Sequence, residues 1–295
     1  MEQATEERPL WRRIVDFPLV AMMIAILLYA CAAVLAVIIE RGLPPMSHGA
    51  RIAAGVLLNV VLLLAAYKLA IRRLGEHPRD DLPGCGALRN LGLGLLGGAI
   101  LFCIVTAAAA LAGMYRIVGC CSTGQLIRDI FETAILAGLG EELLFRGILF
   151  RWIEEFAGSW AALVVTSALF GLVHIENPNA TWFSSFAIAM EAGLLLGGAY
   201  MLTRSLWAPI GLHAAWNFTQ GYIFDIPVSG VPENGLTQAK LSGPALLSGG
   251  QFGLEASVLG LVVATAAGLC LVVLAVRRGK VVQPMWVRRT DSQLD

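Results

Sequence analysis

Three groups of polar residues interrupt apolar stretches of this sequence, and their types could support acid–base chemistry. In chain order they are Glu141, Glu142 and Arg146, then His174, then His213 and Asn217. A carboxylate or a neutral imidazole can take a proton from a reacting group when the fold holds it in place. If these stretches cross a membrane, each ionisable residue at a helix centre costs roughly 2.5–3.5 kcal/mol. We therefore expect these side chains to face a protein-lined or watery interior and to find partners there.

Helix geometry separates the roles of the first group. Glu142 and Arg146 are four residues apart, so on a helix they share a face and can form an ion pair. Such a pair is typical of a structural clamp. Glu141 is rotated by about 100° and is left without that partner. An apolar interior disfavours an unpaired carboxylate, which makes Glu141 the better candidate for a general base.

The composition indicates the environment of these helices. Hydrophobic residues make up 57% of the 295 residues and charged residues only 14%, with a mean hydropathy of +0.73. A soluble domain carries about 25% charged residues, so this chain has too little polar material to coat a water-soluble globule. Lys plus Arg and Asp plus Glu number 21 each, and no charge excess points to nucleic acid. The sequence predicts an integral membrane protein.

A membrane helix needs about 20 apolar residues, and about eight runs approach or exceed that length. They are Phe17–Ile39, Ala50–Ile71, Leu91–Gly113, Ile127–Ile153, Ser159–His174, Trp182–Thr203, Leu206–Phe224 and Leu254–Val276. We predict an all-α bundle that forms a single transmembrane domain over residues 1–295. Lys and Arg concentrate on the side that holds both termini, which predicts cytoplasmic termini, and we expect a bacterial plasma membrane. The long connection 225–253 is expected to be functional or mobile.

The polar groups agree in depth. At 1.5 Å per residue, Glu141 lies roughly 18 Å from the cytoplasmic end of its span, His174 roughly 22 Å, His213 roughly 12 Å and Asn217 roughly 18 Å. Residues on three helices therefore fall near the middle of the bilayer, which predicts one composite site. Glu191, on a fourth helix at roughly 18 Å, either supports that site or makes an unrelated buried hydrogen bond.

Glu-Glu-x-x-x-Arg, Phe-x-x-x-His and His-x-x-x-Asn, in this order on successive hydrophobic segments, resemble one family. It is the family of CAAX proteases and bacteriocin-processing enzymes, also called Abi, whose members are helical intramembrane endopeptidases. The Ras-converting CAAX endopeptidase of eukaryotes is among them. The resemblance covers about residues 125–224 and includes the stretch 203–209 that leads into His213.

The resemblance implies a role for each residue and a substrate class. Glu141, helped by His174, would polarise the attacking water, while His213 and Asn217 would stabilise the oxyanion at the scissile carbonyl. Glu142 and Arg146 would hold their helix in place. The partners implied are the lipid bilayer and a membrane-associated protein or peptide substrate.

Two forms of this chemistry stay open. Glu141, His174 and His213 could form a three-ligand zinc site with an open position for water, as in a metalloendopeptidase. Without a metal, Glu141 takes the proton directly and His213 with Asn217 donates to the developing charge. The metal-free form is favoured, because Asn is an uncommon zinc ligand and a good oxyanion donor.

Two other functions are compatible with the sequence. In a transporter, Glu141, Glu191 and the histidines would form a proton relay, although no inverted repeat supports it. A non-proteolytic member of the family, such as an immunity or chaperone-like protein, would not need its motif residues for activity.

Overall fold

The computed structural model describes residues 8–76, 79–120 and 125–291, and it is predominantly helical. Within these residues six helices are long and apolar enough to cross a membrane. They are Pro18–Arg41 (α2), His48–Arg73 (α3), Ala87–Leu111 (α4), the continuous stretch Leu126–Glu176, Trp182–Thr203 (α8) and Val258–Arg277 (α11). The predicted all-α polytopic membrane protein is confirmed.

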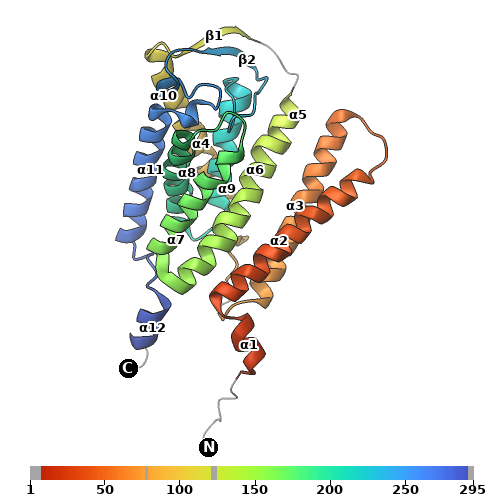
Figure 1. Ribbon diagram of the computed structural model, residues 1–295, viewed down its shortest axis with the longest axis vertical. Helices are drawn as coiled ribbons and strands as arrows, with labels where there is room; N and C mark the ends of the chain where they lie inside the picture. Colours follow the sequence, from red (N-terminus) through yellow and green to blue (C-terminus); the bar gives the residue numbers. More distant parts are fainter. Residues whose placement is uncertain (1–7, 77–78, 121–124, 292–295) are drawn as a thin grey trace, which may run out of the picture.

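The stretch Leu126–Glu176 is one run of helix that reverses direction. It consists of α5 (Leu126–Arg128), η1 (Asp129–Leu136), α6 (Ala137–Glu142), η2 (Leu143–Phe150), α7 (Arg151–Val173) and η3 (His174–Glu176). The bend lies at Gly158, whose φ of 83° favours glycine and whose missing Cβ leaves room for Val282. The chain descends through α6 and returns through α7 (Figure 1).

A shorter helical segment completes the bundle. Trp207–Phe218 (α9) continues into the π-helical Thr219–Ile223 (η4). Counting this segment and both arms of the reversed stretch gives the predicted number of about eight passes. The segments η1 and η2 are also π-helical, a form that is rare and concentrated at functional sites.

Helix α9 packs with its backbone unusually close to α4. A Cβ at Gly94 would lie 2.2 Å from the carbonyl oxygen of Ala208, and a Cβ at Gly98 would lie 2.2 Å from that of Leu212. Gly211 on α9 makes the same kind of close approach, because a Cβ there would lie 2.4 Å from the carbonyl oxygen of Leu91 on α4. Small residues let membrane helices approach this closely, so these glycines fix the position of α9, which carries His213.

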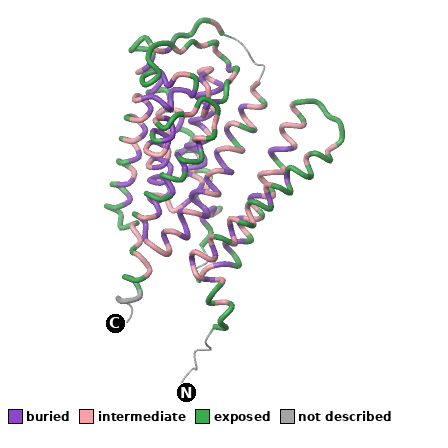
Figure 2. Tube along the Cα trace, viewed as in Figure 1, coloured by how far each residue is buried: buried purple, intermediate pink, exposed green. Residues whose placement is uncertain are grey.

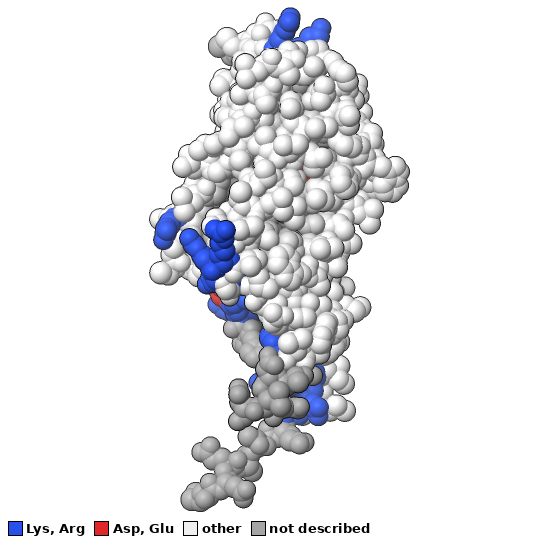
Figure 3. All heavy atoms as spheres, turned by 90° about the vertical axis from the view of Figure 1, so that its left-hand side faces the viewer, with Lys and Arg blue, Asp and Glu red and all other residues white. Residues whose placement is uncertain are grey.

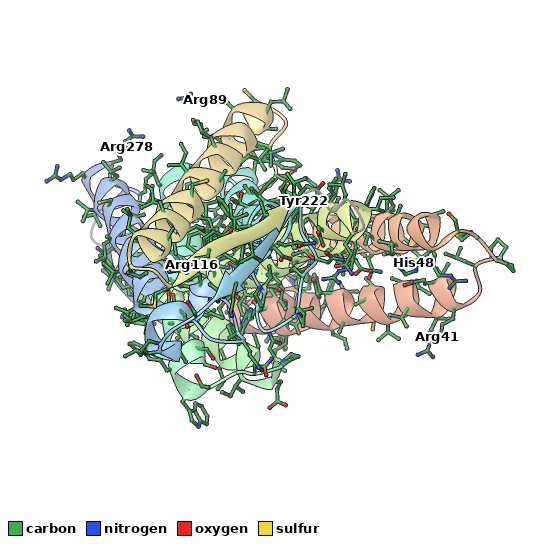
Figure 4. The ribbon with its side chains drawn as sticks, turned by 90° about the horizontal axis from the view of Figure 1, so that it is seen from above. Arg41, His48, Arg89, Arg116, Tyr222 and Arg278 are labelled. Carbon is green, nitrogen blue, oxygen red and sulfur yellow. The ribbon has the colours of Figure 1, made fainter. Side chains whose placement is uncertain are left out.

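A two-stranded antiparallel sheet lies across one end of the bundle (Figure 4). Tyr115–Cys120 (β1) pairs with Thr237–Leu241 (β2). Asp225 accepts from the backbone N–H groups of Gly235 and Ala239, each at 2.9 Å, and so holds β2 against the end of η4. Part of the connection 225–253 is therefore folded, and Ala245–Ser248 (α10) and Leu254–Ala256 (η5) lead from it into α11.

Burial separates the helices into a core and a periphery. Helices α8 and α9 and the segment η2 are mostly buried, whereas α2 and α3 project sideways as a hairpin with exposed outer faces (Figure 2). Arg41 and His48 lie at its tip (Figure 4). On the face drawn in Figure 3, Lys and Arg lie at the top and from about mid-height downward, and a broad band between these two regions is almost without charge. Such a band suits a bilayer interior.

A buried ionic cluster, here called the Asp81 cluster, ties together the opposite end of the bundle, where Leu10–Val15 (α1) and Met285–Asp291 (α12) lie (Figure 1). Asp81 is fully buried between α3 and α4. One of its oxygens accepts from Arg79 Nε at 2.6 Å. The other accepts from Arg151 Nη1 at 2.7 Å and from Tyr200 Oη at 3.1 Å. Helices α7 and α8 are thereby anchored to the connection that precedes α4.

Candidate active site

Glu142 is the centre of the polar group in the middle of the bundle. Its Oε1 accepts from Arg146 Nη1 at 2.8 Å, so the predicted i,i+4 ion pair forms. The same Oε1 lies 3.1 Å from Nδ1 of His213 on α9, a contact that the sequence did not indicate. Glu142 and Arg146 are both fully buried. The first and third motifs are therefore joined directly through a carboxylate and an imidazole.

The second motif lies against the first through an aromatic ring. His174 Nδ1 is 2.6 Å from the carbonyl oxygen of Phe170, one turn earlier. The Phe170 ring covers the guanidinium of Arg146 at 4.8 Å and lies 4.8 Å from the His174 ring, between ring centroids. It also contacts the His213 ring edge-on at 6.1 Å. Phe170 thus contacts the buried cation and both imidazoles.

The hydrogen bonds of the two histidines identify their free nitrogens. A carbonyl or carboxylate oxygen can only accept, so Nδ1 must carry the proton in both rings. In the neutral state Nε2 of each ring is then an acceptor. Each histidine therefore keeps one nitrogen for a reacting group, while the other fixes the ring orientation.

Asn217 lies one turn beyond His213 on α9. Its Nδ2 donates to the backbone oxygen of Thr133 in η1 at 3.1 Å. A Cβ at Gly138 on α6 would lie only 3.0 Å from Ala214 on α9, so the two helices pack closely here. The side chain is thus oriented by the helix that carries the first motif.

These residues meet at one cavity of about 40 Å³, room for a few water molecules at about 10–15 Å³ each. Its lining comprises Phe170, His174, Ile188, Glu191, Ala192, Leu195, Leu196, Leu212, His213, Trp216, Asn217, Ser229, Glu255 and Ala264. His174, His213, Asn217 and Glu191, all singled out from the sequence, are therefore brought together. Sequence reasoning missed Glu255 and Ser229, because nothing in their local pattern marks them.

Glu141 is placed differently. It lies beside the cavity on α6 but is not one of the lining residues. Its Oε2 is buried and has no hydrogen-bond partner among the described residues. On this side of α6, Tyr29 Oη of α2 donates to the carbonyl oxygen of Gly140 at 2.8 Å.

The zinc set predicted as one form of the chemistry is not assembled here. Within the described residues no three His, Cys, Asp or Glu side chains come together as a metal site requires. Glu141, the proposed carboxylate ligand, lies outside the lining that His174 and His213 share. The side chains as placed do not fit the three-ligand geometry of a catalytic zinc ion.

Comparison with known proteins identifies the central part of the chain. The family model for "Type II CAAX prenyl endopeptidase Rce1-like" proteins matches residues 123–219. The curated protein "Putative membrane peptidase YdiL" of Bacillus subtilis (strain 168) is 24% identical over 172 residues, 54% of this chain and 68% of that protein. No solved structure matches. The match over residues 123–219 supports the family that the three motifs predicted, and this stretch is similar to the Rce1-like proteins.

Proposed function

We propose that this protein is an intramembrane endopeptidase that hydrolyses a peptide bond of a membrane-associated protein or peptide. The observation that carries the proposal is the cavity lined by His174, His213 and Asn217, next to the Glu142–Arg146 ion pair that holds His213. The Rce1-like core and the membrane-peptidase relative support a protease.

Glu141 is the general base of this proposal. Arg146 and His213 both form hydrogen bonds with the Glu142 carboxylate. Glu142 is therefore better suited to positioning these side chains than to accepting a proton. Glu141 Oε2 is buried without a hydrogen-bond partner among the described residues. Because it lies outside the lining, the proposal requires its side chain to turn toward the cavity when substrate and water are bound. His174, with Nε2 available, helps to orient and deprotonate the water.

His213 and Asn217 are suited to the oxyanion. The second N–H of the Asn217 amide is not used by the bond to Thr133. His213 donates from Nε2 when its ring is charged, and the Glu142 carboxylate at Nδ1 stabilises that charge. In a site that excludes water such donors stabilise a developing negative charge more strongly than they would in solution.

The experiment compares full-length wild type with Glu141→Gln, His174→Ala and His213→Ala in lipid nanodiscs, incubated with a peptide library and followed by mass spectrometry. We expect each variant to lose at least about 10²-fold in cleavage rate, the contribution of a positioned acid–base group. Glu132→Gln changes an exposed glutamate on η1 and is the control that keeps full rate. Full activity in all three site variants contradicts the proposal.

A second experiment tests whether cleavage requires a metal ion. Because Glu141 takes the proton of the water directly in this proposal, we expect chelation by 1,10-phenanthroline to leave cleavage within twofold of the untreated rate. Ion-dependent solute flux through proteoliposomes, lost in Glu141→Gln while no peptide is cut, would favour the transporter instead.

A further inference from the structure

Two carboxyl groups with no role in the proposed hydrolysis line one wall of the cavity. Glu191 comes from α8 and is 3% exposed, and Glu255 comes from η5 and is 5% exposed. A Cβ at Gly260 would lie 3.2 Å from Glu191 Oε2 and 3.2 Å from the Cα of Glu255. The two acids, 64 residues apart in sequence, are therefore neighbours in space.

Among the described residues, neither acid forms an ion pair with Lys or Arg. Glu255 Oε1 accepts from the backbone N–H of Ser229, which is a neutral donor. Glu191 Oε2 is buried without a partner among the described residues. The cavity lining contains no Lys or Arg, and Phe170 covers the guanidinium of Arg146. An uncompensated pair of buried acids is costly, which favours a ligand that brings the missing positive charge.

We propose that Glu191 and Glu255 form a subsite that binds a primary ammonium group of the substrate. An ammonium group has nearly the size of a water molecule and carries three N–H donors, which matches a small cavity with two acceptor side chains. The apolar lining, with Leu195, Leu196 and Trp216, surrounds the alkyl chain of the ligand. The imidazoles and Asn217 on the same cavity place the ammonium beside the bond to be cut.

The ammonium can come from a lysine side chain of the substrate or from the amino group freed by cleavage. The role of this subsite in substrate recognition rests on the proposed endopeptidase function. Binding of an ammonium group to it can be measured without turnover. The probes are n-hexylammonium, which matches a lysine side chain, and leucinamide, which matches a new peptide N-terminus. Their uncharged counterparts are n-hexanol and N-acetyl-leucinamide.

Thermal unfolding of the full-length protein in nanodiscs measures binding. We expect at least one ammonium probe to raise the unfolding midpoint while its uncharged counterpart does not. In Glu191→Gln and in Glu255→Gln we expect the same shift to need at least tenfold more probe. Glu132→Gln should respond as wild type does. The probe that binds identifies the source of the ammonium.

Equal shifts by charged and uncharged probes in wild type overturn the subsite, and this comparison needs no variant to fold. Unchanged binding in both glutamine variants overturns it as well. Failure of the proposed function has a different signature, because a protein that binds the ammonium and cuts no peptide retains the subsite and loses the protease. Peptide cleavage without any ammonium selectivity leaves the protease and rejects the subsite.

Discussion

Two buried ionic groups in this protein each combine a carboxylate with arginine side chains. They differ in whether both oxygens of the carboxylate have hydrogen-bond donors. In the Asp81 cluster both carboxylate oxygens have donors, from Arg79 on one side and from Arg151 and Tyr200 on the other. In the central site one oxygen of Glu142 takes both donors, while Oε2 of Glu142 is buried without a hydrogen-bond partner among the described residues.

The difference indicates what each group is for. A buried polar network with every acceptor engaged stabilises one arrangement of its helices. Buried groups left unsatisfied are rare in proteins and call for a ligand, water or chemistry to explain them. Only the central site adjoins the cavity that holds His174, His213 and Asn217. We therefore assign the Asp81 cluster to stability and the central site to reactivity.

Glu142→Gln should produce the largest effect. The Gln side chain cannot stabilise a charged His213, so we expect cleavage per folded molecule to fall by about 10²–10⁴-fold. The measurement is the initial rate on a peptide that wild type cleaves, normalised to folded protein. A merely structural role would leave that normalised rate unchanged, whereas Glu142→Asp, which keeps the charge, should recover part of the rate.

Asp81→Asn should show the opposite pattern. Removing one charge breaks the buried ion pair between Asp81 and Arg151, which costs about 3–5 kcal/mol of stability. We expect a lower unfolding midpoint in nanodiscs, with cleavage per folded molecule within about twofold of wild type. A large loss of normalised activity without destabilisation would erase the contrast between the two groups.

The smallest effect concerns a third acidic group, at the end of the bundle covered by the sheet. Glu233 bonds Arg128 at 2.5 Å, close to the buried Asp129. Burial, opposed by Arg128 and reinforced by Asp129, raises the pKa of Glu233 to about 8. A raised carboxyl pKa means that the folded state holds the proton more tightly, so stability falls as pH rises from about 4.5 to about 8.

Limited proteolysis of the connection 225–253 checks this prediction. We expect faster cutting at pH 9 than at pH 6 in wild type, after correction for protease activity with an unfolded reference peptide. Glu233→Gln cannot ionise and should reduce that pH dependence. Equal pH dependence in wild type and variant would show that another group anchors the connection.

Patterns along one helix were readable from the sequence. Apolar run lengths predicted the bundle, and the i,i+4 spacing predicted the Glu142–Arg146 pair, because both depend on helix geometry alone. The common depth of His174, Asn217 and Glu191 followed from the 1.5 Å rise of a helix, and the structure brings them to one cavity.

Contacts between distant segments were decided only by tertiary structure. The bond between Glu142 and His213 depends on how α6 rotates against α9, which a π-helical segment and the close approach of Gly138 to Ala214 determine. The same rotation places Glu141 beside the cavity instead of in its lining. Rotation about a helix axis leaves no trace in hydropathy, because a bilayer accepts any apolar face.

The sequence by itself determined that this protein lies in a membrane and which residue types are available for its site. Hydrophobic composition dictates a membrane interior, and there each ionisable side chain must have a purpose because its insertion is costly. Tertiary structure alone decided which acids share a cavity and which are neutralised, bringing Glu255 to Glu191 and leaving Asp81 fully paired. Charge compensation is a matter of a few ångströms, and only the folded chain defines such distances.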